Sequence, residues 1–240
     1  MVVGYRRTAL GTEAVRWSAS EGVMGLGYLA GGSSQSIVWG VSADGSVVVG
    51  QSGYSADTRA FRWTAEDGLV GLGDLPDGPF SSAAADVSAD GSVVVGAGDR
   101  TADGGHAFRW TEAGGMVDLG LLPGAPSGAP WSGAAGVSAD GSVIVGTATS
   151  STSNEAFIWE EANGMRELDQ VLGQLGVDLA GWRLISAVGV SADGLTITGS
   201  GTNPSGVREP WIAVVPEPGT AALVGLGLVV LATSRRRTAR

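Results

Sequence analysis

VSADGSVVVG, residues 41–50, is the stretch that decides the fold, because it recurs along the chain. Its first five residues begin again at Val87, Val137 and Val190, at spacings of 46, 50 and 53 residues. A β-branched run that ends in Gly follows in the first three copies, and the fourth copy reads Leu-Thr-Ile-Thr-Gly at 195–199. Such a period is typical of an array of similar supersecondary units.

Each repeat predicts four short strands. The valine run at 47–49 is apolar on both faces, as expected for a strand that is covered on both sides. The strand that follows, at 60–64, points Phe61 and Trp63 one way and Arg62 the other. A turn that contains Gly and another apolar strand complete the unit. Four strands in a period of 46–53 residues match a propeller blade, so the sequence predicts an all-β, propeller-like array over 1–214.

A tryptophan lies in the short strand that follows the β-branched run of each unit, 13 or 14 residues beyond the glycine that ends this run. At strand spacing we interpret these rings as packing between blades, although they could also line a face that binds carbohydrate. The repeated aromatic residues are Trp17, Trp63, Trp110 and Trp159.

The aspartate of each repeat is expected in a tight hairpin turn, beside a glycine that can adopt positive φ. Calcium binding is the alternative, but calcium prefers six or more oxygen ligands and only Asp86 adds a neighbouring carboxylate. We therefore predict four turn residues and no metal site. They are Asp44, Asp90, Asp140 and Asp193.

Little in the sequence points to catalysis. His106 is the single histidine, and no Gly-x-Ser-x-Gly elbow is present. We interpret His106 as an exposed residue at a strand edge. Paired carboxylates for glycoside hydrolysis stay open, because any two of the 24 acidic residues could converge in the fold. The expectation is a protein without catalytic activity and without a cofactor.

In residues 1–214 the only segment with a pattern that suggests a helix is Glu167–Leu179. The last 26 residues differ from this part of the chain in composition. Two prolines in Val215-Pro216-Glu217-Pro218 stop the preceding strand. The uncharged run 219–234 is rich in Ala, Leu, Val and Gly and predicts a short transmembrane helix of roughly 24 Å. Three arginines then form a membrane stop signal that stays on the cytoplasmic side. They are Arg235, Arg236 and Arg237.

Pro-Glu-Pro, a short apolar helix and a final Arg cluster together resemble the PEP-CTERM sorting signal of Gram-negative bacteria. The resemblance covers 215–240 and implies export, transient retention in the inner membrane and processing by an exosortase-type enzyme. The product would reach the cell surface or the extracellular matrix, often in exopolysaccharide producers. Recognition would fall to Pro216, Glu217 and Pro218. The tail is also labelled an ice-binding protein C-terminal domain, a label that implies no ice binding here; an ordinary anchor with a chance Pro-Glu-Pro is the alternative.

The repeats are similar to the HAF repeats of extracellular bacterial proteins. His106-Ala107-Phe108 spells the signature, and Arg59-Ala60-Phe61 and Glu155-Ala156-Phe157 vary its first residue. The last unit, from Gly181 to Ile212, is similar to the terminal unit that often precedes such a tail. This resemblance implies a β-propeller-like extracellular domain over 1–214 and supplies no activity.

Composition agrees with export. Residues 1–214 carry 10 Arg and 23 Asp or Glu, a net charge of −13, whereas the tail carries 4 Arg against Glu217 alone. An acidic domain of this kind argues against nucleic acid or anionic lipid as a partner. The chain has no Cys, so disulfides and thiolate metal sites are excluded.

The sequence begins in the middle of a repeat. Gly4 to Trp17 and Gly50 to Trp63 are both 13 residues apart, so Met1 takes the register of Val47. Export also requires a signal peptide with a basic start and an apolar core. We therefore expect the true start, the signal peptide and earlier blades upstream, and about three full blades with a partial one at each end.

Three classes of function remain at this point. The leading one is a non-catalytic surface or matrix protein whose propeller binds a partner or polysaccharide. The second is a propeller hydrolase of matrix glycans, which predicts carboxylates clustered at one mouth of the ring. The third is an ice-binding or adhesive protein, which predicts a flat Thr-rich face that the repeats do not show.

Overall fold

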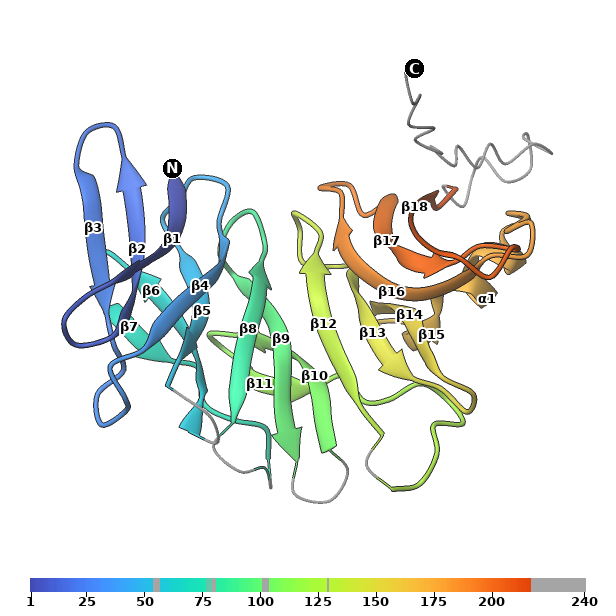
Figure 1. Ribbon diagram of the computed structural model, residues 1–240, viewed down its shortest axis with the longest axis horizontal. Helices are drawn as coiled ribbons and strands as arrows, with labels where there is room; N and C mark the ends of the chain where they lie inside the picture. Colours follow the sequence, from blue (N-terminus) through green and yellow to red (C-terminus); the bar gives the residue numbers. More distant parts are fainter. Residues whose placement is uncertain (54–56, 77, 79–80, 101–103, 129, 217–240) are drawn as a thin grey trace, which may run out of the picture.

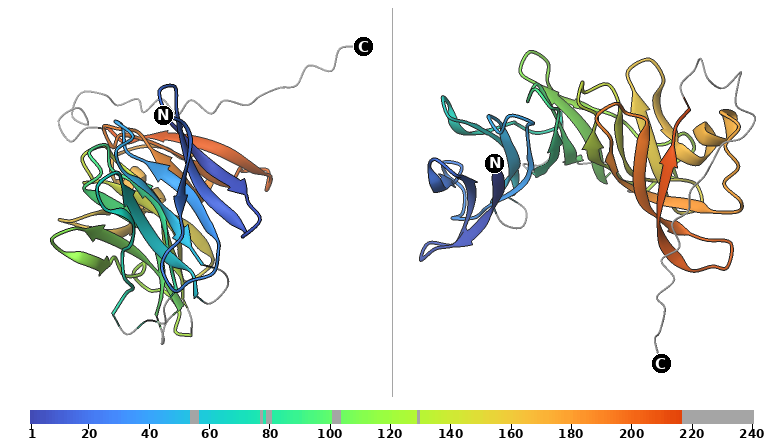
Figure 2. Two further views of the ribbon diagram at one scale, coloured as in Figure 1. Left: turned by 90° about the vertical axis from the view of Figure 1, so that its left-hand side faces the viewer. Right: turned by 90° about the horizontal axis from the view of Figure 1, so that it is seen from above.

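The computed structural model describes residues 1–216 except 54–56, 77, 79–80, 101–103 and 129. Five antiparallel sheets stand side by side in chain order, and the first and last sheets lie at opposite ends of the molecule (Figure 1). Seen from above, the sheets fan around an open side, and the fan does not close (Figure 2). The described chain therefore forms an open, propeller-like array, as the repeats predicted.

Three sheets have four strands, and each follows the chain in a simple meander. The second sheet contains β4 (Ser36–Val41), β5 (Val48–Ser52), β6 (Arg59–Thr64) and β7 (Gly68–Gly71). The third contains β8 (Ser82–Val87), β9 (Val93–Arg100), β10 (Gly104–Thr111) and β11 (Gly115–Asp118). The fourth contains β12 (Ser132–Val137), β13 (Ile144–Thr149), β14 (Asn154–Glu160) and β15 (Gly164–Glu167).

The two end sheets have three strands each, which agrees with the expected partial blades. The first contains β1 (Val2–Arg7), β2 (Thr12–Ser18) and β3 (Gly22–Gly27), and the fifth contains β16 (Arg183–Val190), β17 (Thr196–Thr202) and β18 (Arg208–Val214). Val2 pairs with Trp17 as Val48 pairs with Trp63. This register confirms that Met1 stands in the position of Val47.

The turn glycine of each repeat packs against the preceding sheet. Gly91 adopts φ 75°, and a Cβ at this position would lie 2.4 Å from Cγ2 of Val47. Glycine is required twice over, for its backbone conformation and for the close approach. The pairs are Gly45 with Met1, Gly91 with Val47, Gly141 with Val93 and Gly194 with Val143.

Backbone hydrogen bonds join the same turns into what we call the turn ladder. The amide of Ala43 donates to the carbonyl of Ala89, that of Ala89 to Ala139, and that of Ala139 to Ala192, each at 3.0 Å. The ladder runs from the second sheet to the fifth. Each turn is thus held to the next by one hydrogen bond and one glycine contact.

A buried serine at the start of an inner strand makes a second link between neighbouring sheets. Ser82 accepts a hydrogen bond from the amide of Ala60 at 3.1 Å and donates to the carbonyl of Gly73 at 3.1 Å. Ala60 lies in the preceding sheet and Gly73 follows the last strand of that sheet, so one hydroxyl satisfies two of its backbone groups. Ser36 makes the same two hydrogen bonds, with Ala14 and Gly27. Ser132 makes them with Ala107 and Gly120.

The core lies between the sheets, with one apolar cluster at each interface. Val48 and Val49 are fully buried on opposite faces of β5, as the valine run predicted. Trp63 is also buried, and Trp110 and Trp159 pack against the edges of two clusters. Trp17 differs, because no described sheet covers its face and the residue is 45% exposed.

A short helix completes the interface between the fourth and fifth sheets. The predicted helix at Glu167–Leu179 forms as α1 (Leu168–Gln174), and Gly176, at φ 80°, follows its end. Leu168 and Leu172 are fully buried in the apolar cluster of this interface. The helix therefore contributes the apolar side chains that join these two sheets.

We predict that Gly91→Ala destabilises the protein more than Gly68→Ala does. Both glycines have φ near 70°, where alanine costs about 1–2 kcal/mol. Only Gly91 faces Val47, and overpacking there adds about 1–3 kcal/mol. Urea unfolding of both variants measures the difference, because the space beside Gly68 is open. Equal losses of free energy of unfolding would show that the contact with the preceding sheet carries no stability.

Candidate functional site

The four predicted turn aspartates lie in the turns that build the ladder and share one geometry. Oδ1 of Asp140 accepts hydrogen bonds from the hydroxyl of Ser138 at 2.6 Å and from the amide of Ser142 at 3.0 Å. The hydroxyl of Ser138 in turn accepts the amide of Val143 at 3.0 Å. Asp44, Asp90 and Asp193 repeat this arrangement with their own serines. These carboxylates hold the turns, as the sequence predicted.

The hydrogen bonds keep these carboxylates ionised. Donation from Ser88 and Ser92 lowers the pKa of Asp90 to about 2, and donation from Ser138 and Ser142 lowers the pKa of Asp140 to about 2. The pKa values of Asp44 and Asp193 are lowered by the same kind of bond. Within the described residues, no three His, Cys, Asp or Glu side chains lie close enough to hold a metal ion together.

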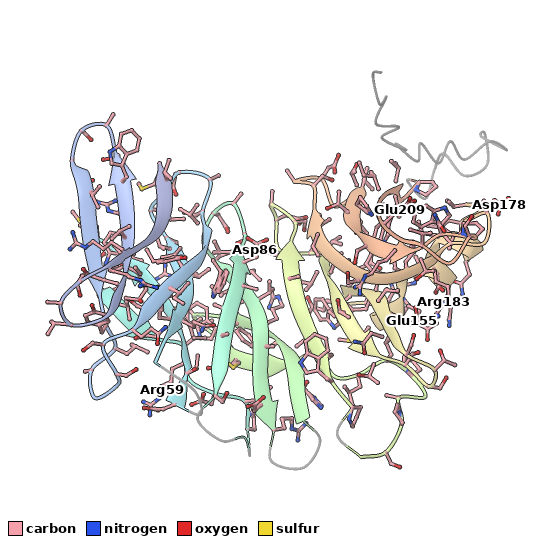
Figure 3. The ribbon with its side chains drawn as sticks, in the orientation of Figure 1. Arg59, Asp86, Glu155, Asp178, Arg183 and Glu209 are labelled. Atoms are coloured by element: carbon pink, nitrogen blue, oxygen red, sulfur yellow. The ribbon has the colours of Figure 1, made fainter. Side chains whose placement is uncertain are left out.

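Asp86 has a role separate from that of the turn aspartates. Its Oδ1 accepts the amide of Val87 at 2.9 Å, and its Oδ2 accepts the amide of Val137 in the next sheet at 3.0 Å. Burial raises the pKa of this carboxyl, and the two amides oppose the rise. Asp86, labelled in Figure 3, lies directly after the bulge of its inner strand. The inner strands of three other sheets have Gly40, Gly136 and Gly189 at this position.

His106 is buried, so the prediction of an exposed strand-edge residue was wrong. Its side chain is 4% exposed, and Nδ1 lies 2.9 Å from Oδ2 of Asp118 on β11. Arg100 of β9 forms an ion pair with the same carboxylate at 2.7 Å. Burial of the imidazole is tolerated because Asp118 satisfies one ring nitrogen. Nε2 has no partner among the described residues, so no nucleophile accompanies the pair.

The first residue of the His-Ala-Phe signature occupies one register position in the second, third and fourth sheets and has its own ionic partner there. Arg59 pairs with Asp57 at 3.0 Å in the second sheet. Glu155 of β14 pairs with Arg183 of β16 at 2.8 Å and so joins the fourth and fifth sheets (Figure 3). His106 fills the position between them in the third sheet. The three residues therefore differ together with their ionic partners.

A cavity of about 370 Å³ opens between the third and fourth sheets. Arg109 of β10 lines it from the third sheet, and the turn 140–142 and Trp159 line it from the fourth. Residues 160–162, which continue from the end of β14, complete the wall. The cavity thus combines a guanidinium, an aromatic ring and several carboxylates. Sequence reasoning singled out Trp159 and Asp140 but missed Arg109, which lies beside them because the third and fourth sheets pack together.

The sorting motif begins where the last sheet ends. β18 ends at Val214, and the amide of Val215 donates to the carbonyl of Leu195 at 2.7 Å. Pro216 is the last described residue. Glu217, Pro218, the predicted helix 219–234 and Arg235 to Arg237 lie outside the described residues. In the part of the chain that is described, no helix has the length and hydropathy needed to cross a membrane.

Comparison with known proteins finds both a sorting signal and a fold. Residues 214–237 match the PEP-CTERM protein-sorting motif. TolB from Acinetobacter baumannii is similar in structure, with a TM-score of 0.56 and 12% identity over 89% of this chain and 50% of that one. A putative TolB from Agrobacterium tumefaciens is similar with a TM-score of 0.50 and 11% sequence identity, over 90% of this chain and 70% of that one. No match was found among curated proteins.

The motif and the similar structures indicate different properties of the protein. The motif covers only the end of the chain and marks an exported protein that an exosortase-type enzyme sorts. The TolB structures are too distant in sequence to indicate more than a β-propeller-like fold. The chain spans half the length of the Acinetobacter protein.

We predict that replacing the turn carboxylates flattens the acid dependence of stability. In the wild type the lowered pKa stabilises the fold fully above pH about 4, and this contribution is lost as the pH falls toward about 2. The double variant Asp90→Asn/Asp140→Asn should be less stable at pH 7, and its deficit should shrink between pH 4 and 2. Urea midpoints across this range measure the deficit. A deficit independent of pH would contradict this role, and Glu66→Gln on an exposed turn serves as the control.

Proposed function

We propose that this protein is a non-catalytic surface or extracellular-matrix protein whose propeller-like domain binds a polysaccharide. The observation that carries the proposal is the PEP-CTERM motif at 214–237, which begins at the last residue of β18. A folded domain ends there and a sorting signal takes over. Such an arrangement suits a protein whose working part is delivered outside the cell.

The tail would act in two steps. Residues 219–234 would hold the exported chain transiently in the inner membrane, and Arg235 to Arg237 would remain on the cytoplasmic side. An exosortase-type enzyme would recognise Pro216, Glu217 and Pro218 and release the domain to the surface or matrix. The likeness of the repeats to HAF repeats supports an extracellular site of action.

Polysaccharide is the partner that the composition of the domain favours. The net charge of −13 over residues 1–214 disfavours nucleic acid and anionic lipid. The cavity between the third and fourth sheets offers Trp159 beside polar groups, a combination typical of small-ligand sites. A role without catalysis agrees with turn aspartates whose Oδ1 atoms hold backbone amides and serine hydroxyls.

Replacement of Pro216-Glu217-Pro218 by three alanines should abolish processing. We expect the full-length variant to accumulate in the membrane fraction of a bacterium with an exosortase-type enzyme, while the wild-type domain appears shortened in the medium or on the surface. Immunoblots of cell fractions and the intact mass of the released domain measure the outcome. Pro123→Ala/Pro126→Ala, which removes two prolines from an exposed loop, is the matched control. Normal release of the triple variant would rule out sorting through this motif.

A further inference from the structure

An arginine precedes the repeat tryptophan in the first three sheets, and in two of them a carboxylate in the same sheet neutralises it. Arg16 of the first sheet pairs with Glu21 at 2.8 Å, and its Cζ lies 4.7 Å from the ring centroid of Trp63 in the next sheet. Arg62 of the second sheet lies 3.9 Å from Asp67. Each acid follows its arginine by five residues. The guanidinium at these two interfaces is therefore already occupied.

The third sheet breaks this pattern. Five residues beyond Arg109 the chain has Gly114 in place of an acid. The Arg109 side chain forms no ion pair or hydrogen bond with any residue in the described ranges. The 370 Å³ cavity opens at this interface, with Arg109 on one wall and Trp159 on the other. Loss of one carboxylate thus leaves a half-buried cation without a partner beside an aromatic ring.

We propose that this cavity binds a neutral hexose unit of a polysaccharide, an inference that rests on the function proposed above. The ring of Trp159 offers an apolar face to the C–H side of a sugar ring. Arg109 provides N–H donors for hydroxyl oxygens, and Glu161 accepts hydrogen bonds from hydroxyl groups. A hydroxyl both donates and accepts, so a sugar satisfies the two walls together.

The charges around the cavity favour a neutral sugar over an acidic one. Asp140 lines the cavity with a pKa lowered to about 2 and is ionised at neutral pH. Glu160 and Glu161 add two more carboxylates, of which Glu160 is paired with Arg166. One guanidinium therefore faces more than one negative charge, and an anionic ligand would be repelled at short range.

The second sheet indicates which substitution would occupy Arg109 and so block the site. The amide of Gly114 donates to Oγ1 of Thr111 at 3.1 Å, and the amide of Asp67 donates to Oγ1 of Thr64 at 3.0 Å in the same turn of the second sheet. A Cβ at Gly114 would lie 2.9 Å from Oγ1 of Thr111, so this hydroxyl has to shift slightly, and no other atom lies within 4 Å. Aspartate should therefore fit at this position and neutralise Arg109 as Asp67 does Arg62.

Binding of the full chain to neutral hexaoses (cellohexaose, maltohexaose and mannohexaose) and to hexagalacturonate tests the inference by calorimetry. We expect the wild type to bind at least one neutral hexaose more tightly than hexagalacturonate. Gly114→Asp should raise its Kd at least about tenfold, because Arg109 would lose its bonds to the sugar. Trp159→Ala should raise the Kd for this hexaose by at least the same factor. Gly114→Asn, which adds the same bulk without charge, should bind as the wild type does.

Trp17→Ala is the aromatic control, since Trp17 holds the same repeat position but no described sheet faces it. Near-ultraviolet circular dichroism shows whether each variant keeps its fold. If Trp159→Ala does not fold, the hexaose affinity of Gly114→Asp alone tests the site. A wild type that binds no polysaccharide would overturn the proposed function. Wild-type binding that survives both Gly114→Asp and Trp159→Ala would overturn this site while leaving that function intact. Tighter binding of hexagalacturonate would overturn the neutral ligand class.

Discussion

The close contact between each turn glycine and a side chain of the preceding sheet is the constraint on which the array depends. Gly91 and Gly141 approach Val47 and Val93 so closely that no side chain fits, and the turn ladder fixes the same approach through the backbone. The buried serines then repeat the link at the other end of the inner strands. In the second, third and fourth sheets both ends of the inner strand are therefore tied to the sheet before it, and these interfaces differ mainly in their side chains.

Fixed spacing lets single substitutions create local chemistry without disturbing the fold. The position of Asp86 holds glycine in three other sheets, yet there it becomes a carboxylate that bridges two sheets. Gly114 acts in the opposite direction, because it removes an acid that the first two sheets retain. The cavity beside Arg109 thus lies where the repeated pattern lacks one carboxylate. Function in such an array is found by comparing equivalent positions between sheets.

Much of the fold followed from the repeat, because turn chemistry and strand period are local properties. The turns at Asp44 and Asp140, the register of Met1 and the partial end sheets could all be predicted from spacing. The environment of His106 could not, since Asp118 reaches it from another strand. The same holds for the neighbours of Arg109, since Asp140 and Trp159 reach the cavity from the next sheet. Pairings across strands depend on tertiary geometry, which periodicity leaves open.

The two ends of the array meet solvent in different ways. In the fifth sheet Thr198 takes the place of Val49, Val95 and Val145, which are fully buried against a following sheet. A threonine there suits a face that water contacts. The first sheet instead keeps Val2 and Trp17 exposed at positions that are buried as Val48 and Trp63 in the second. The fifth sheet nevertheless keeps apolar side chains on this face, because Ile212, which pairs with Thr198, is 47% exposed.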